Sequence, residues 1–219
     1  MNETEFLMWV RGPAFQIATI VFVVGVVVRV LEILLLGRKG NLAEARGSAM
    51  AGGLRTILTR MWPDRGTLQR STFTVVAGYV FHIGLFVTVF LSAPHILLIR
   101  DVFGVGWASL PTTIIDATTV VTIITLLAVL VYRLTNPVQR FLSGFQDYFV
   151  WLVTILPLVT GYLAFHRIGM APPMLLAIHI LSVELLMVSF PFTKLMHAFT
   201  LFMARWYNGA IAGYRGVRS

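Results

Sequence analysis

The sequence predicts an all-α integral membrane protein with five transmembrane helices in a bundle. Composition is the first reason. Of the 219 residues, 58% are hydrophobic and 12% are charged, whereas soluble domains are roughly 45–50% apolar and 25% charged. The mean hydropathy is +0.85. The second reason is that the apolar residues form long continuous runs, without the alternation typical of an outer-membrane strand. A lipid bilayer is therefore the expected surroundings of most of the chain.

Five apolar runs are long enough to cross roughly 30 Å of hydrocarbon, which takes about 20 helical residues. They cover residues 13–36, 73–99, 111–132, 147–165 and 173–203. Acidic Glu3 and Glu5 stand where a cleaved signal peptide would be basic, so the first helix is expected to be retained. No repeat or linker interrupts the sequence, which predicts a single membrane domain over residues 1–219.

The basic residues predict the orientation of the helices, because Lys and Arg collect in cytoplasmic loops. Most basic residues fall on one side of the membrane, the predicted inner side. They are Arg38, Lys39, Arg46, Arg55, Arg60, Arg65 and Arg70 in loop 37–72, Arg133 and Arg140 after the third run, Arg205, Arg215 and Arg218 in the carboxyl-terminal tail, and Arg29 and Lys194 toward inner helix ends. Arg11, Arg100 and Arg167 fall on the other side. We predict an outer amino terminus and a cytoplasmic carboxyl terminus. The net charge of +8 flanks the membrane, so nucleic acid is not an expected partner.

Loop 37–72 contains one helical pattern of its own. Apolar residues recur there at helical spacing: Leu54, Ile57, Leu58, Met61 and Trp62. This spacing predicts a short amphipathic helix that ends near Trp62 and Pro63. We expect it to lie on the inner membrane surface or under a partner subunit.

The histidines are the residues most suited to chemistry within the membrane, where titratable side chains are costly and rare. In a continuous helix, His179 and His197 are about five turns apart and leave the same face near opposite membrane surfaces. His82 lies in the inner half of the second run and His95 near its outer end. Two facing pairs are predicted, His82 with His197 and His95 with His179.

Two such pairs would suit two b-type haems, because a six-coordinate iron accepts a nitrogen from each side. The iron ligands are then His82 and His197 for an inner haem, and His179 and His95 for an outer one. His82 and His95 point in different directions on a straight helix, so the outer pair requires Pro94 to kink or end it. His166 is a rival outer ligand. Cysteine is absent, so this chain cannot itself hold a thiolate-bound iron–sulfur cluster.

Several motifs resemble one family. They are Phe81-His82-Ile83-Gly84, Ile178-His179 and the string Phe190-Pro191-Phe192-Thr193-Lys194-Leu195-Met196-His197. Together with the five-helix plan, they make the chain similar to the gamma subunit of respiratory nitrate reductases, the haem-bearing membrane subunit. The long inner loop with Arg46-Gly47-Ser48 looks more like the related cytochromes of heterodisulfide-reductase-like and sulfite-reduction-associated complexes.

The resemblance implies a di-haem cytochrome b in the cytoplasmic membrane of a bacterium or archaeon. Such a subunit passes electrons between membrane quinol and an iron–sulfur subunit on the cytoplasmic face, and a further subunit carries out terminal catalysis. By resemblance, His82 and His197 hold the inner haem and His179 the outer one. In that family, the second helix has two haem-binding histidines, and the second of them follows the first by about three turns. This sequence reads Leu91-Ser92-Ala93-Pro94 before His95 there, which departs from the pattern.

Quinol oxidation releases protons, so a quinone site at the membrane boundary is expected to contain titratable groups. His95, Arg100 and Asp101 are the candidate residues for this site. Two other functions stay open. The histidines could relay protons or bind a metal in a small transporter or channel, or the chain could be a purely structural membrane anchor.

Overall fold

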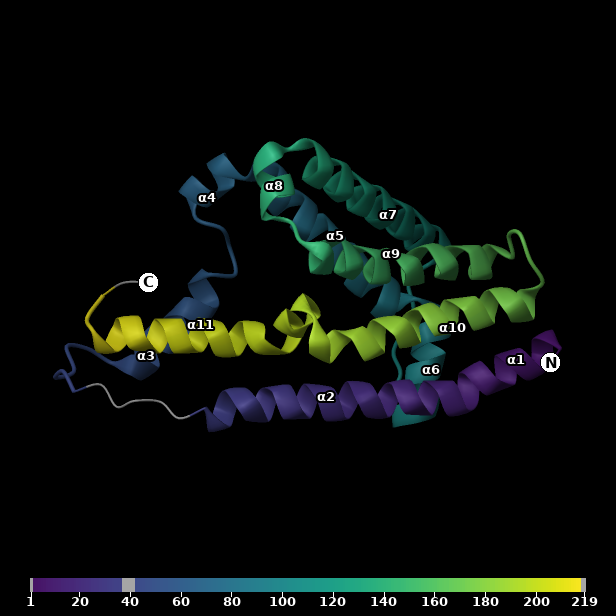
Figure 1. The fold of residues 1–219 in the computed structure, drawn as a ribbon, viewed down its shortest axis with the longest axis horizontal. Helices are drawn as coiled ribbons and strands as arrows, with labels where there is room; N and C mark the ends of the chain where they lie inside the picture. Colours follow the sequence, from purple (N-terminus) through teal and green to yellow (C-terminus); the bar gives the residue numbers. More distant parts are fainter. Residues whose placement is uncertain (1, 37–41, 218–219) are drawn as a thin grey trace. The chain divides into compact units, whose positions relative to one another are not determined.

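The computed structural model describes residues 2–36 and 42–217. Every regular element in these two ranges is helical (Figure 1). Five of the described helical stretches are long and apolar enough to cross a membrane: Glu3–Leu35, Thr72–Leu91, Thr112–Thr135, Phe145–His166 and Pro172–Phe192. The predicted all-α multi-pass membrane protein is confirmed. Three of the basic residues used to predict orientation, Arg38, Lys39 and Arg218, lie outside the described ranges.

The helices follow one another in this order: α1 (Glu3–Trp9), a π-helical turn (Val10–Ala14), α2 (Phe15–Leu35), α3 (Ala49–Thr59), α4 (Arg65–Arg70), α5 (Thr72–Leu91), α6 (Ala93–Phe103), α7 (Thr112–Thr135), α8 (Pro137–Leu142), α9 (Phe145–His166), α10 (Pro172–Ser189), two 3₁₀ turns (Phe190–Phe192 and Lys194–Met196) and α11 (His197–Tyr214). The first span begins earlier than the predicted residue 13, because Asn2 caps α1 and the π turn accommodates Pro13 within the helix.

The chain divides into two units. The first comprises Met1–Gln16 and Ser71–Leu186, and the second comprises Ile17–Arg70 and Met187–Ser219. Each unit is described by itself. The single membrane domain predicted from the sequence stays a prediction.

Helices α5, α7 and α9 form the core of the first unit. Leu126 of α7 packs with Ile155 and Leu158 of α9, and Phe81 and Leu85 of α5 contact this cluster. Elsewhere in the first unit, small and hydroxyl-bearing residues let neighbouring helices approach each other more closely, which is typical of helix pairs in membranes. At Gly84 of α5 an added Cβ would lie 1.9 Å from Oγ1 of Thr122 in α7. This glycine therefore serves helix packing.

The second predicted run, 73–99, is two helices instead of one. Helix α5 ends at Leu91, Ser92 is extended, and α6 begins at Ala93 with Pro94 in its first turn. Proline has no N–H to donate to the turn before it, and its ring clashes there, so a helix starts well at this residue but does not continue through it. The predicted effect of Pro94 on the helix is confirmed.

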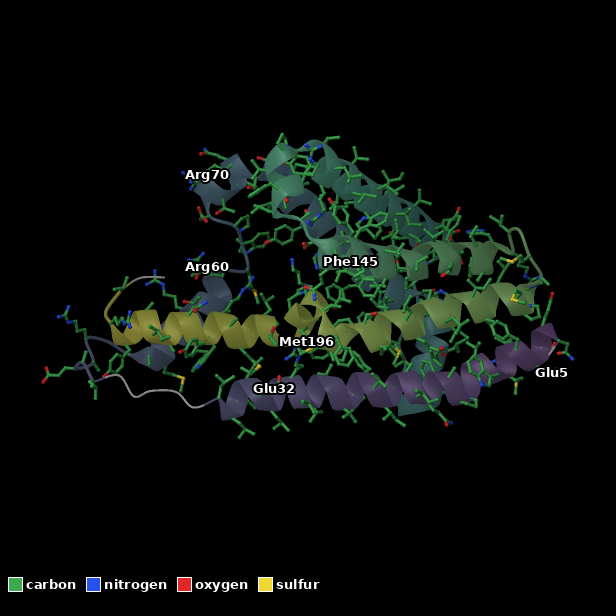
Figure 2. All side chains as sticks on the ribbon, viewed as in Figure 1. Glu5, Glu32, Arg60, Arg70, Phe145 and Met196 are labelled. Atoms are coloured by element: carbon green, nitrogen blue, oxygen red, sulfur yellow. The ribbon has the colours of Figure 1, made fainter. Side chains whose placement is uncertain are left out.

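The fifth predicted run, 173–203, is wrong as one continuous helix. Helix α10 ends at Ser189, Thr193 is extended, and α11 starts only at His197. Figure 2 labels Met196 at this break. Pro191 lacks the N–H that would continue α10, and within the second unit its carbonyl accepts a bond from Nε of Arg29 at 3.2 Å. The argument that His179 and His197 leave one face of a straight helix therefore fails.

Helices α3 and α11 pack side by side in the second unit (Figure 1). An added Cβ at Gly52 of α3 would lie 2.3 Å from the carbonyl oxygen of Gly209 and 2.7 Å from Cα of Gly213. The two backbones thus touch through glycines, as in close membrane helix pairs. Helix α3 ends at Thr59, so the short helix predicted to end near Trp62 and Pro63 is confirmed. Leu54 and Leu58 of this helix, and Trp62 beyond it, are exposed.

Gly84→Ala should destabilise the first unit, whereas Gly78→Ala should not. A Cβ at Gly84 overlaps Thr122, but a Cβ at Gly78, in the same helix, meets nothing within 4 Å. Overpacking of this kind costs about 1–3 kcal/mol. Thermal unfolding of both variants in detergent measures the difference. Equal thermal unfolding midpoints for the two variants would show that α5 does not pack tightly against Thr122 of α7 at Gly84.

Candidate functional site

The carboxyl-terminal end of α5 orients the imidazole ring of His95. The last four carbonyl groups of a helix have no hydrogen-bond donor within that helix. In α5, three of these four carbonyls accept from donors in the residues that follow the helix. The carbonyl oxygen of Thr88 accepts from Nδ1 of His95 at 3.0 Å, and that of Phe90 accepts from Nε1 of Trp107 at 2.7 Å. The carbonyl of Leu91 accepts from the backbone N–H of Leu110 at 3.0 Å. The helix break therefore fixes both the ring of His95 and the segment that leads to α7.

His95 and His179 are brought together within the first unit. Their ring centroids are 6.1 Å apart and their planes differ by 26°. With metal–nitrogen bonds of about 2.0 Å, two imidazoles that bind one metal from opposite sides have centroids roughly 6 Å apart. The separation leaves room for a metal between the rings, and His95 and His179 are the residues that would hold a haem, which would supply one-electron chemistry there.

The ring of His179 is oriented by α9. Its Nδ1 lies 3.3 Å from Oγ1 of Thr160. The Thr160 hydroxyl also donates to the Leu156 carbonyl at 2.7 Å. In the tautomer in which Nδ1 of His179 donates to Thr160, Nε2 carries the lone pair. Such a bond to the second ring nitrogen is what metal-binding histidines almost always have.

Gly161 makes room for the same ring. An added Cβ at this residue would lie 2.9 Å from Cε1 of His179. Ser182, one turn beyond His179, is bonded to the Thr160 hydroxyl at 2.9 Å and to the His179 carbonyl at 2.6 Å. Residues of α9 and α10 together thus hold the His179 imidazole in one position.

His82 and His197 belong to different units, so their pairing as inner ligands stays a prediction from the sequence. Each has the same local arrangement. Nδ1 of His82 donates to the carbonyl of Gly78 at 2.7 Å, and Nδ1 of His197 donates to that of Lys194 at 2.7 Å. Because a carbonyl can only accept, both neutral rings have their lone pair on Nε2.

His166 has the opposite arrangement. Its Nε2 lies 3.2 Å from Oδ1 of Asp116. Here Nε2, and not Nδ1 as in the other four histidines, is directed to a protein acceptor, a carboxylate of α7. The structure therefore places His95 against His179, and His166 against Asp116.

The other residues predicted for the quinone site lie on α6. Arg100 and Asp101 are both exposed, about one and a half turns beyond His95. His95 itself faces His179.

Sequence reasoning missed Thr88, Thr160, Gly161 and Asp116 as partners of the histidines. Thr88 could have been found, because a carbonyl three residues before a helix end needs an external donor. The contacts of the other three depend on how α7, α9 and α10 pack, and no local pattern indicates them. Among the described residues there is no group of three or more His, Asp or Glu side chains that could hold a metal ion.

The sequence is 30% identical over 212 residues to a protein of Nitratidesulfovibrio vulgaris (strain Hildenborough), which covers 92% of this chain and 91% of that protein. The chain belongs to the family of that protein. The name of this relative states no activity, and no family model matches the sequence.

Proposed function

We propose that the protein is a membrane cytochrome b, the quinol-reactive subunit of a respiratory oxidoreductase complex, with a b-type haem held between His95 and His179. The observation that carries this proposal is the 6.1 Å separation of the two imidazole centroids. The bonds from Nδ1 of His95 to Thr88 and from Nδ1 of His179 to Thr160 support it, because they leave the Nε2 lone pairs for a metal.

When bound, the haem supplies a one-electron acceptor and donor within the membrane. The chain's own residues do the remaining work. His95 and His179 hold the iron, and Thr88 and Thr160 orient their rings. A second haem on His82 and His197, as the sequence predicts, is part of the proposal and rests on the sequence and on the Nδ1 bonds of each histidine.

Electrons from quinol then pass to an iron–sulfur partner on the cytoplasmic face. Cysteine is absent from the chain, so any iron–sulfur cluster must be held by another subunit. The α3–α11 pair supports such docking, because the glycine contacts join the two helices and Arg55, Arg60 and Arg215 are exposed on them or beside them. The alternatives are a transporter or channel and a purely structural anchor, and a measured haem content would exclude both.

Replacement of His95 or His179 by Ala should remove the haem bound between them. The purified wild-type protein is expected to show the reducible absorption bands of a b-type cytochrome, and each variant should lose the same part of that signal. His82→Ala and His197→Ala should remove a second part. A wild-type protein without such bands, after haem has been supplied during expression, would contradict the proposed function.

Thr160→Val should weaken haem binding by about 10- to 100-fold, the range seen when a partner of a metal ligand is removed. Valine keeps the shape of the side chain but cannot accept a bond from Nδ1 of His179. Thr154→Val is the matched control, because the Thr154 hydroxyl, in the same helix, is bonded to the carbonyl of Val150. Haem titration of the apoproteins measures both. Equal affinities would mean that Thr160 does not orient the ligand.

Arg55→Glu with Arg60→Glu should release the iron–sulfur partner, because reversal of two exposed charges on one side of a contact opposes a complementary surface. Co-purification from membranes, with iron and acid-labile sulfide as readouts, measures the retained partner. Arg100→Glu changes an exposed arginine on the side predicted to be outside, and it should retain the partner. Equal retention in both variants would place the docking surface elsewhere.

A further inference from the structure

The His166–Asp116 pair joins the ends of two membrane helices in the first unit. His166 is the last residue of α9, and Asp116 lies in the second turn of α7. Nε2 and Oδ1 are 3.2 Å apart, and the side chains are 31% and 29% exposed. The pair is thus partly covered but accessible at the end of the bundle.

Asp116 sets the protonation pattern of the ring. A carboxylate only accepts, so in the neutral imidazole Nε2 carries the proton and Nδ1 carries the lone pair. A carboxylate that accepts from one nitrogen of a histidine makes the other nitrogen a better proton acceptor, because it stabilises the imidazolium that forms. His82, His95, His179 and His197 are held the other way, through Nδ1.

Aromatic rings flank this base. The rings of Tyr162 and His166 have centroids 4.4 Å apart, and those of Phe165 and His166 are 5.3 Å apart at 82°. A quinol is a flat apolar ring that carries two hydroxyl groups, so aromatic neighbours beside a proton acceptor match its chemistry.

The pair also lies close to the proposed haem ligands. Gly161 of α9 contacts the ring of His179, and His166 follows it five residues later, which is about 7.5 Å along the helix. Five residues also turn about 140° around the helix, so a quinol beside His166 would lie about one and a half turns along α9 from the residue that packs on His179.

We propose that His166 is the residue that takes the hydroxyl protons of quinol, with Asp116 as its positioning residue; this inference rests on the proposed function. One quinol loses two electrons and two protons and becomes a quinone. A haem held by His95 and His179 would supply the acceptor for the two electrons. Each O–H bond breaks as its proton passes to Nδ1 of His166, and the imidazolium releases that proton to water at the exposed end of α9 before the next transfer.

His166→Gln should slow haem reduction by a short-chain naphthoquinol on the order of 10²-fold, the usual contribution of a general base. Stopped-flow absorbance of the haem-loaded protein measures the rate. Full reduction by dithionite should be unchanged, because that reductant releases no hydroxyl proton. In His166→Ala, added imidazole should restore part of the rate.

Asp116→Asn should lower kcat with quinol more than it changes KM, and Asp116→Glu should recover part of kcat. Thr113→Val is the matched control, because Thr113 is an exposed polar residue of the same helix end and should leave the rate unchanged. If Arg100→Ala with Asp101→Asn slows quinol oxidation while His166→Gln does not, the proton acceptor lies on α6 and the proposal is wrong.

A binding measurement separates this inference from the proposed function. In ¹⁵N-histidine NMR spectra, the His166 ring signals are assigned by their absence in His166→Gln, and oxidised short-chain naphthoquinone should shift them. No shift at His166 would overturn the inference even in a haem-loaded protein. Absence of haem from the wild type would instead overturn the proposed function, while the naphthoquinone titration would still decide whether quinone binds at His166.

Discussion

The hydrogen bond from Nδ1 of His95 to the carbonyl of Thr88 is the interaction on which the site depends. It exists because Ser92 and Pro94 end one helix and start the next, which leaves the final carbonyls of α5 without helical donors. A continuous helix would have paired the Thr88 carbonyl internally and turned the His95 ring elsewhere. At this break, the same hydrogen bond provides the Thr88 carbonyl with a donor and orients the His95 ring toward His179.

Much of the fold could be predicted from the sequence because the signals are local. Runs of about 20 apolar residues have few alternatives to a spanning helix, and a proline inside such a run indicates a possible break. At Pro191 the same rule competes with apolar residues that continue past the proline, and these alone indicate one continuous run over residues 173–203. The helix stops at this proline, so the carbonyl of Pro191 has no helical donor, and it accepts from Nε of Arg29 instead.

The contacts of the site were less predictable, because they depend on packing between helices. The role of Gly84 depends on Thr122 of another helix, against which an added Cβ would clash, and nothing in α5 alone indicates that contact. Between membrane helices there is little hydrophobic driving force, so close backbone contact and hydroxyl bonds determine the register. That register brings Thr160 and Gly161 to His179, and no spacing within α9 or α10 alone reveals it.

The ring nitrogen that each histidine uses separates two kinds of chemistry. A metal ligand benefits from an acceptor at Nδ1, which orients the ring and raises the basicity of Nε2, and a carbonyl or hydroxyl oxygen is sufficient for that. A proton acceptor benefits from a full negative charge, because the charge stabilises the protonated ring. Of the five histidines, His166 has the carboxylate, and it lies at a helix end where protons can leave. If the proposed roles hold, that difference in partners keeps the residues that bind the haem apart from the residue that takes the protons.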